Sequence, residues 1–481
     1  MKKIYTASLL AGISGYLLGS LSKKKTLKSK EPKIRLEKVL SIKGHGLYEC
    51  VDNSDTTLLN GSFKFTFPSH KKTEEIYGEF IRTELNTPDE IPFFPWRFIG
   101  ESENGEPLIA SGLALSSYKE NLENFSKVNL GFSYNELQIG EPSNFTSLSF
   151  FVPDIKIEFD RMEKIGKRLI RNHSNFVLTY KESNYKIEFK NINRTLNTME
   201  KNILESNFPL KITLTKDNQL IDFEDAKTVL DYVLELISLA YGSRVLWRYV
   251  IGYKNDVECF RFFRNTKHSN VSSFRNLISI DRPGMFTQFI TSTFPSYIQL
   301  SKDYHLSLIK LIDGLHFSSE RLTFPMPIVT LSSSIEEFAN EVLNERVTHY
   351  TDKSTRKNLY PLFNKWIDQN VIPLLSEIDK QDFGEGSSKQ KLSALLQRNL
   401  RSRITFLFDQ YNIQYDDTVV RNFVKKRNNA AHGTYKFENA DFLLWSTMVS
   451  YLEQLILKTI NYNGHYLDWS TSPPEDKRIE D

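Results

Sequence analysis

The sequence predicts an α+β protein in which a β-rich amino-terminal domain, sandwich or barrel-like, precedes an all-helical bundle. Two patterns predict this order. Apolar and polar residues alternate in short runs as far as residue 215, as in residues 62–67 (SFKFTF), and apolar residues recur at helical spacing after about residue 294. Of the 481 residues, 40% are hydrophobic and 13% aromatic, which excludes a disordered chain.

We expect four segments along the chain. They are residues 1–35, an apolar run with a lysine-rich flank; 36–293, a β-rich sensor or regulatory domain; 294–466, the helical bundle; and 467–481, a flexible tail.

The first segment contains an uncharged run, residues 4–22, that could just cross a bilayer as a helix. Three interpretations fit it: a membrane anchor, a cleaved signal peptide, and a flexible or buried helix. Lysines at positions 23, 24, 25, 28 and 30 follow the run. An anchored chain would therefore keep its body in the cytoplasm, tethered to the inner face of the cytoplasmic membrane.

The β-rich segment continues with alternating runs at 76–82, 128–139, 147–152 and 176–188. Residues 222–241 then read as one amphipathic helix with acidic residues in its first turn, and strand-like runs return at 245–253 and 257–263. The cluster of Arg244, Trp247 and Arg248 could stack nucleic-acid bases, but a strand packed beneath the preceding helix is the simpler interpretation.

The helical spacing of apolar residues in the carboxyl-terminal half predicts several helices. A capping box formed by Ser333 and Glu336 is expected to open one of them. The other expected helices span residues 305–317, 360–378, 389–411, 417–431 and 440–462.

Neither a metal nor another cofactor is expected. The two cysteines, Cys50 and Cys259, lie far apart without a partner motif, and the nine histidines show no metal-ligand spacing.

The end of the predicted helix 417–431 carries the best candidate for chemistry. Residues 427–433 read RNNAAHG. Asn428 and His432 are four residues apart and share a helix face, while Arg427 adjoins Asn428 with a side chain long enough to reach the same cleft. Gly433 suits a left-handed helix end.

These side chains suit cleavage of RNA without a metal ion. The imidazole of His432 can take the proton of a ribose 2′-hydroxyl or give one to the departing 5′-oxygen. The Arg427 guanidinium can stabilise charge on the phosphoryl oxygens, and Asn428 can orient the phosphate or His432. We therefore expect Arg427, Asn428 and His432 to be catalytic, and DNA, which lacks the 2′-hydroxyl, to be left uncut.

This motif in a carboxyl-terminal helical bundle resembles the HEPN superfamily. The resemblance implies a metal-independent endoribonuclease in which two copies pair so that two motifs face one cleft. The long β-rich part before the bundle, including residues 107–115 (PLIASGLAL), resembles the ApeA-type abortive-infection proteins of bacterial phage defence. That likeness implies a toxin-like effector.

Charge is also concentrated near the motif. Residues 1–35 hold nine basic residues and one acidic residue, so the rest of the chain is mildly acidic overall; residues 389–427 nevertheless hold nine basic residues against three acidic ones. Such a local excess suits a confined RNA groove, and a solvated helix face is the alternative. The candidate RNA-binding residues are Arg398, Arg401, Arg403, Arg421, Lys425 and Lys426.

The leading hypothesis is therefore an anti-phage endoribonuclease whose bundle forms a homodimer and whose β-rich domain senses a phage-derived trigger. Its partners would be RNA, a second copy and, through residues 4–22, a membrane. A non-catalytic HEPN module for association is one alternative. A membrane-tethered sensor whose helical half recruits another effector is a further one.

Overall fold

The computed structural model describes residues 40–52, 55–67, 76–81, 95–120, 127–153, 155, 157, 161–165, 168–192, 208–217, 219–265, 275–279, 282–319, 323–343, 348–376, 380, 396–471 and 473–479. The chain forms two compact units, Met1–Leu40 and Ser41–Asp481. The uncharged run at 4–22 and its lysine-rich flank lie outside the described residues. Within the ranges above, every helix is too short or too polar to cross a bilayer.

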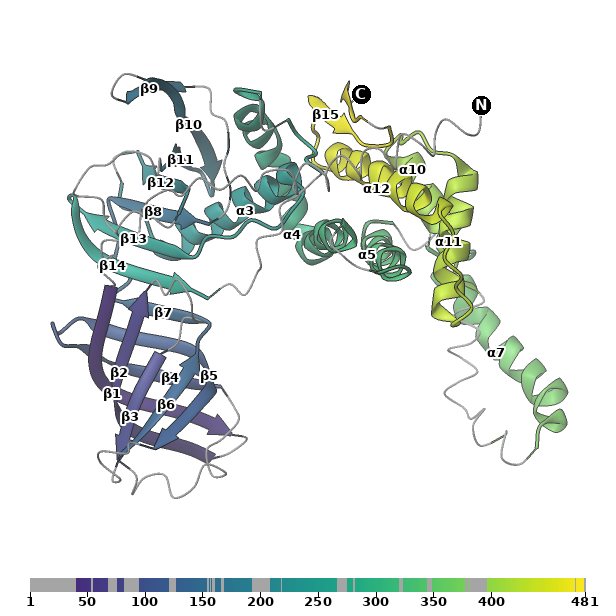
Figure 1. Ribbon diagram of the computed structural model, residues 1–481. Helices are drawn as coiled ribbons and strands as arrows, with labels where there is room; N and C mark the ends of the chain where they lie inside the picture. Colours follow the sequence, from purple (N-terminus) through teal and green to yellow (C-terminus); the bar gives the residue numbers. More distant parts are fainter. Residues whose placement is uncertain are drawn as a thin grey trace, which may run out of the picture. The chain divides into compact units, whose positions relative to one another are not determined.

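The second unit confirms the α+β prediction. Strands β1 to β14 of the described residues form one large sheet, and helices dominate the later part of the chain. In Figure 1 the purple and blue strands accordingly precede the green and yellow helices.

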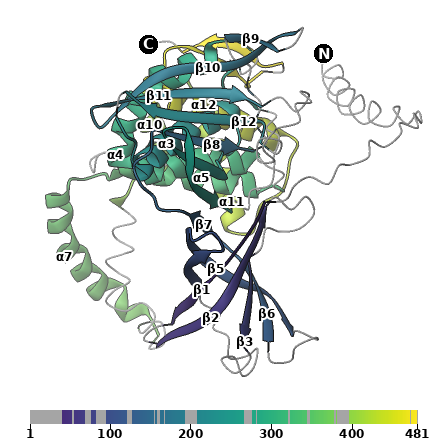
Figure 2. The same ribbon diagram turned by 90° about the vertical axis from the view of Figure 1, so that its left-hand side faces the viewer.

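Six strands close into a barrel. The order β4-β1-β2-β3-β6-β5 returns to its start because β5 also pairs with β4. Strands β1, β2, β3, β5 and β6 are labelled together in the lower part of Figure 2. Closure leaves no unpaired edge among these six strands. The strands are β1 (Leu40–Asp52), β2 (Asp55–Phe67), β3 (Ile76–Ile81), β4 (Trp96–Ser102), β5 (Pro107–Glu120) and β6 (Lys127–Ser133).

Aromatic rings fill the barrel. The ring of Tyr48 is 0% exposed and lies 4.8 Å from that of Phe80 and 4.7 Å from that of Phe98. Gly46 and Gly100 face each other on β1 and β4, and a Cβ on Gly100 would come within 2.7 Å of the Phe98 ring. Glycine at this crossing therefore lets the ring lie against the backbone.

The sheet continues from β5 in the order β7-β14-β13-β8-β12-β11-β10-β9. These strands are β7 (Glu136–Ile139), β8 (Ser147–Val152), β9 (Arg161–Ile165), β10 (Arg168–Tyr180), β11 (Ser183–Asn191), β12 (Leu210–Lys216), β13 (Tyr249–Lys254) and β14 (Val257–Arg264). Long β5 is shared by the barrel and this second part, because its first residues pair with β7 and its last with β6.

Helix α3 (Phe223–Tyr241) packs on this second part of the sheet. Asp222 caps its first turn, Gly242 ends it with φ 72°, and the predicted apolar stripe is buried. The Phe223 ring lies 4.9 Å from Phe260 and 5.3 Å from Phe262, both on β14. The predicted helix 222–241 is therefore confirmed together with its direction of burial.

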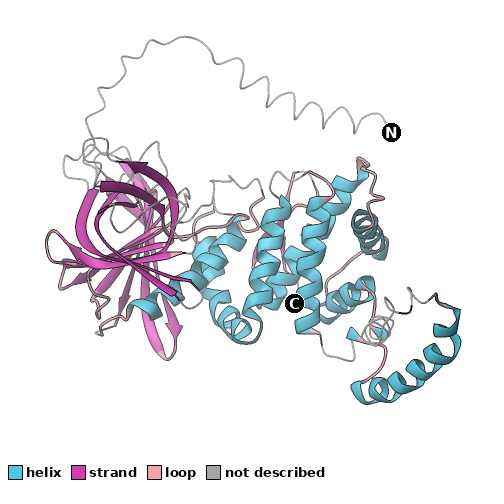
Figure 3. Cartoon of the chain, turned by 90° about the horizontal axis from the view of Figure 1, so that it is seen from below, coloured by secondary structure: helices cyan, strands magenta, loops and turns pink. Residues whose placement is uncertain are grey.

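The remaining helices form the carboxyl-terminal part, drawn in cyan in Figure 3. Helix α12 is its most buried element, with Met448, Leu452, Leu455 and Ile456 all 0% exposed. The helices are α4 (Met285–Ser319), α5 (Met326–Val342), α7 (Lys353–Asn370), the short η3 (Ile372–Leu374), α10 (Leu400–Gln410), α11 (Asp417–Ala431) and α12 (Ala440–Thr459).

Three expectations differ from the structure. Ser333 and Glu336 form no capping box, since α5 begins at Met326 and the Ser333 hydroxyl donates to the Val329 carbonyl inside the helix. The expected domain boundary at 293/294 falls within α4. Part of the expected flexible tail is ordered, because β16 (Glu475–Arg478) pairs with β15 (His465–Asp468).

A buried ion pair joins the segment after β14 to α12. The guanidinium of Arg275 donates from Nε and Nη2 to the two carboxylate oxygens of Glu453, each at 2.8 Å, and to the hydroxyls of Ser446 and Ser450. The two charged side chains are 5% and 8% exposed. The two hydrogen bonds to one carboxylate neutralise the Arg275 guanidinium, whose burial without a counter-charge would cost free energy.

We expect Glu453→Ala to lower the free energy of unfolding by about 3–5 kcal/mol, because it leaves Arg275 buried without its counter-charge. Urea denaturation of the full chain measures the loss. Glu475→Ala is the matched control, since the Lys477–Glu475 pair is exposed and is worth less than about 1 kcal/mol. Equal stability of Glu453→Ala and the wild type would contradict the assigned role.

Candidate active site

Helix α11 positions the motif and has the predicted bounds. Its N-cap, Asp416, accepts a hydrogen bond from the Thr418 amide at 2.7 Å, and His432 is the C-cap. Gly433 follows with φ 69°, and a Cβ there would meet nothing within 4 Å. The glycine is therefore required by backbone conformation and not by crowding, as expected for a left-handed helix end.

The structure brings two of the three motif side chains together. Arg427 Nη1 donates to Asn428 Oδ1 at 3.2 Å, and Arg427 Nη2 lies 3.3 Å from Glu336 Oε2 on α5. The His432 side chain is exposed and makes no hydrogen bond or ion pair with the described residues. Arg427 is thus held toward α5, and His432 is free to meet a molecule from solvent.

Glu336 also holds a second arginine. Its Oε1 accepts from Arg403 Nη2 at 2.6 Å, while Arg403 Nη1 donates to the side chain of Asn340, one turn further along α5. Arg403 is only 8% exposed. One carboxylate therefore links α5 to α10 through Arg403 and to α11 through Arg427.

Two of the other predicted RNA-binding residues, Arg398 and Arg401, already have partners. Arg398 packs its guanidinium over the rings of Tyr350 and Phe406, 4.9 Å from each. Arg401 Nε donates to Asp417 Oδ1 at 3.1 Å. These contacts stabilise the bundle and leave less of each cation available to an outside anion.

Lys426 contacts the loop before α12 and the first turn of that helix. Its ammonium lies 3.0 Å from Asp441 and 3.2 Å from Glu438, and Asp441 also accepts from the Tyr435 hydroxyl at 2.7 Å. Burial raises the pKa of the Asp441 carboxyl, but the hydrogen bonds from Tyr435 and Lys426 outweigh burial and leave that pKa below its ordinary value. The positive charge of Lys426 is therefore neutralised by carboxylates of its own chain.

Four residues of α11 form an exposed stripe that ends at the motif. Arg421, Lys425, Asn428 and His432 recur every three or four residues and are all exposed. This spacing places them along one face of the helix. Arg421 and Lys425 have no ion pair among the described residues, so the exposed stripe offers two available cations on the helix face that also carries His432.

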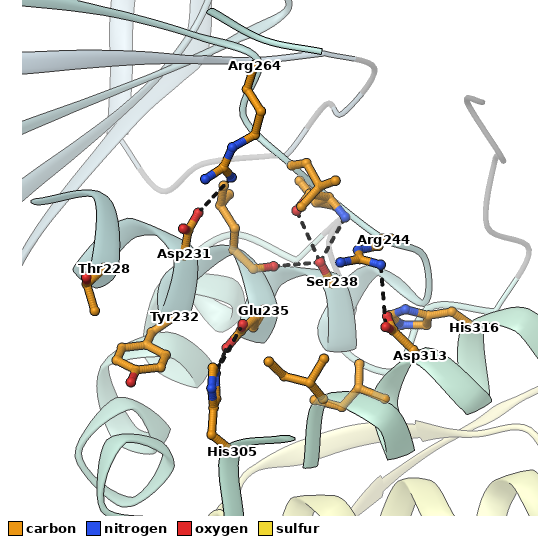
Figure 4. Close-up of a pocket in the computed structure, with 15 residues that line it drawn as sticks. Thr228, Asp231, Tyr232, Glu235, Ser238, Arg244, Arg264, His305, Asp313 and His316 are labelled. Atoms are coloured by element: carbon orange, nitrogen blue, oxygen red, sulfur yellow. Dashed lines mark hydrogen bonds and ion pairs between the residues drawn. The ribbon is translucent and has the colours of Figure 1, made fainter. Parts of the chain in front are cut away.

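A second concave site, which the sequence did not reveal, lies between α3 and α4 (Figure 4). This crevice has a volume of about 350 Å³ and is bordered by two ion pairs and by a histidine that is hydrogen-bonded to a carboxylate. They are Arg264 with Asp231, Arg244 with Asp313, and His305 with Glu235, each at 3.4 Å. Asp231 and Glu235, one turn apart on α3, were a sequence signal for this site, but their partners Arg264 and His305 lie on other elements.

The tryptophan near this crevice is a core residue. Trp247 is 0% exposed and its Nε1 donates to Asp231 at 2.8 Å, while the Arg264 guanidinium lies 4.1 Å from the ring. Both of its faces are enclosed, so it is not free to stack on a base. Trp247 is buried against α3 as the simpler interpretation expected, but residues 244–248 do not form the expected strand, because β13 begins only at Tyr249.

Two histidines of the crevice differ in their proton affinity. A hydrogen bond to Glu235 raises the pKa of His305, whereas burial lowers the pKa of His316 to about 4. His316 is 7% exposed and is therefore held neutral inside the fold.

Comparisons with protein-family models, curated proteins and solved structures find no match for this chain. The geometry and the residue chemistry of the site are therefore the basis of its function below.

We expect Glu336→Ala to lower the free energy of unfolding by about 2–4 kcal/mol, because Arg403 would be buried without its carboxylate. Arg427→Ala should cost less than about 1 kcal/mol, since its pair with Glu336 is partly exposed. Urea denaturation at pH 7 compares the two variants. An equal loss in both would mean that Arg403 does not depend on Glu336.

The free energy of unfolding should also fall as the pH is lowered, because His316 takes up a proton more readily in the unfolded chain. The unfolded chain takes up this proton below about pH 6.5, whereas the folded protein does so only near pH 4, so folding is weakened as pH falls through that window. The difference amounts to about 2 kcal/mol at pH 5.

His316→Gln should remove that part of the pH dependence, as measured by urea midpoints at pH 7 and pH 5. Thr228→Ala, which changes another side chain of the same crevice, should keep it. A pH profile of His316→Gln identical to that of the wild type would contradict the buried neutral imidazole.

Proposed function

We propose that the protein is a metal-independent endoribonuclease of the HEPN type. The observation that carries the proposal is the end of α11, where Arg427 is oriented by Glu336 and Asn428 while His432 is exposed one turn beyond Asn428. A fixed guanidinium and an accessible imidazole at the same end of α11 are the two kinds of group that cleavage by the 2′-hydroxyl requires.

The chemistry follows from these groups. The 2′-oxygen attacks the adjacent phosphorus, the bond from phosphorus to the 5′-oxygen breaks, and the products end in a 2′,3′-cyclic phosphate and a 5′-hydroxyl. His432 takes the proton of the 2′-hydroxyl or gives one to the 5′-oxygen. Arg427 stabilises the charge that develops on the phosphoryl oxygens, and Asn428 keeps its guanidinium in place.

One imidazole serves as acid or base, so a second copy would complete the site. Phe437 and Phe442, which lie on the segment that follows the motif, are 57% and 54% exposed. Exposed aromatic side chains of this size favour association, and a two-fold homodimer would bring two α11 helices to one cleft. The β-rich half would then sense a phage-derived trigger, and residues 4–22 would tether the protein to the membrane.

A non-catalytic interaction module is the second candidate. Helix α7 favours it, because Leu362 and Trp366 are 65% and 56% exposed on one helix and only Arg356 of α7 is buried. Such an apolar surface fits a protein partner. In this case the contacts among Glu336, Arg403 and Arg427 would serve structure alone.

The decisive experiment is cleavage of total RNA in EDTA by purified full-length protein. We expect His432→Ala to lower the rate at least about 100-fold, since general acid–base catalysis is lost, while the unfolding midpoint stays unchanged. His465→Ala is the matched control because His465 lies on β15 and pairs with Asp476. Full activity of His432→Ala would rule out the assigned mechanism.

The same variants separate the two candidates. An interaction module predicts that Arg427→Ala lowers self-association in sedimentation while RNA stays intact even with the wild type. An endoribonuclease predicts cut RNA with the wild type and loss of cutting in Arg427→Ala.

A further inference from the structure

A groove lies between α11 and α12, next to the motif. Its volume is about 450 Å³, within the range of small-ligand sites. Four polar side chains of α11 line one wall, and residues of α12, among them Leu443 and Leu444, line the other. The groove is lined by Val419, Asn422, Lys425, Lys426, Asn429, Glu438, Ala440, Asp441, Leu443, Leu444 and Thr447.

The polar wall of the groove is available to a ligand. The side chains of Asn422, Lys425 and Asn429 make no hydrogen bond or ion pair with the described residues. Lys426, by contrast, is neutralised by Glu438 and Asp441 at the end of the groove. The groove therefore offers two amides and one cation.

The polar wall continues into the exposed stripe. Asn429 precedes His432 by three residues and Lys425 precedes it by seven, so both lie within about 60° of His432 around the helix axis. Lys425 is about 10 Å from His432 along that axis. An RNA strand bound at His432 would therefore place its neighbouring nucleotides in the groove.

The opposite wall suits the face of a ring. Leu443 is 64% exposed and Leu444 is half-buried beside it. An asparagine amide presents an N–H donor beside a carbonyl acceptor, and these match the N7 acceptor and the N6 donor of adenine. A lysine beside these groups suits the phosphate of the same nucleotide.

We propose that this groove binds an unpaired nucleotide of the RNA substrate next to the cleaved bond, with adenine as the preferred base. Asn422 and Asn429 contact the base edge, Leu443 contacts its face, and Lys425 contacts its phosphate. The inference rests on the proposed RNA cleavage and adds the feature that would select the cut site.

Binding is tested in the full-length His432→Ala protein, so that RNA stays intact. Fluorescence anisotropy measures the affinities of single-stranded oligoadenylate and oligouridylate of equal length. We expect the added change Asn429→Ala to weaken oligoadenylate binding about tenfold and oligouridylate binding less than about twofold. Asn422→Ala should act in the same direction. Asn358→Ala, at an exposed asparagine of α7, is the matched control and should change neither.

Equal effects of Asn429→Ala on both oligonucleotides, or no effect, would overturn the proposal. So would a loss of self-association in this variant, which would identify the groove as a contact between copies. Cleavage by the wild type is measured separately. Its absence would refute the proposed function, whereas adenine-selective binding lost in Asn429→Ala would still uphold the groove as a nucleotide site.

Discussion

The carboxylate of Glu336 is the group on which the candidate site depends. Arg403 is a nearly buried cation, and such a charge is tolerated inside a fold only with a close counter-charge. One oxygen of Glu336 serves that purpose, and the other remains for Arg427. Because the two arginines lie on α10 and α11, the packing of three helices and the direction of the Arg427 guanidinium are set by the same contact.

This arrangement also explains why a single copy would be an incomplete enzyme. Residues five apart on a helix differ by about 140° around its axis, so Arg427 and His432 leave α11 on different sides. Arg427 meets α5, His432 faces solvent, and Asn428 lies between them and contacts Arg427. A second α11 facing the first would place the imidazole of one copy near the guanidinium of the other, as the proposed homodimer requires.

The sequence predicted those elements whose ends are marked by local chemistry. Helices α3 and α11 were predicted closely, and in the structure an acidic N-cap precedes each of them and a glycine, Gly242 or Gly433, lies at or just after the end. The start of α5 was wrong, since the serine and glutamate spacing that resembles a capping box occurs inside the helix, where Glu336 binds arginines instead. That contact joins residues 67 and 91 positions apart, and no local pattern reports such a separation.

The role of the basic residues near the motif could not be read from sequence spacing either, because their partners lie elsewhere in the chain. Their contacts determine how strongly RNA binding depends on charge. Arg398, Arg401, Arg403 and Lys426 read as a charged groove in sequence, but aromatic rings or carboxylates of the chain already contact each of them. A lysine or arginine on an amphipathic helix has the same spacing whether it faces solvent or an internal partner.

Arg421 and Lys425 remain as available cations on α11, so each copy would contact only about two phosphates through them. Since each neutralised phosphate of a single strand adds about 0.7 to the salt slope, affinity would depend only weakly on ionic strength, and selection of RNA would have to come from the groove and the motif.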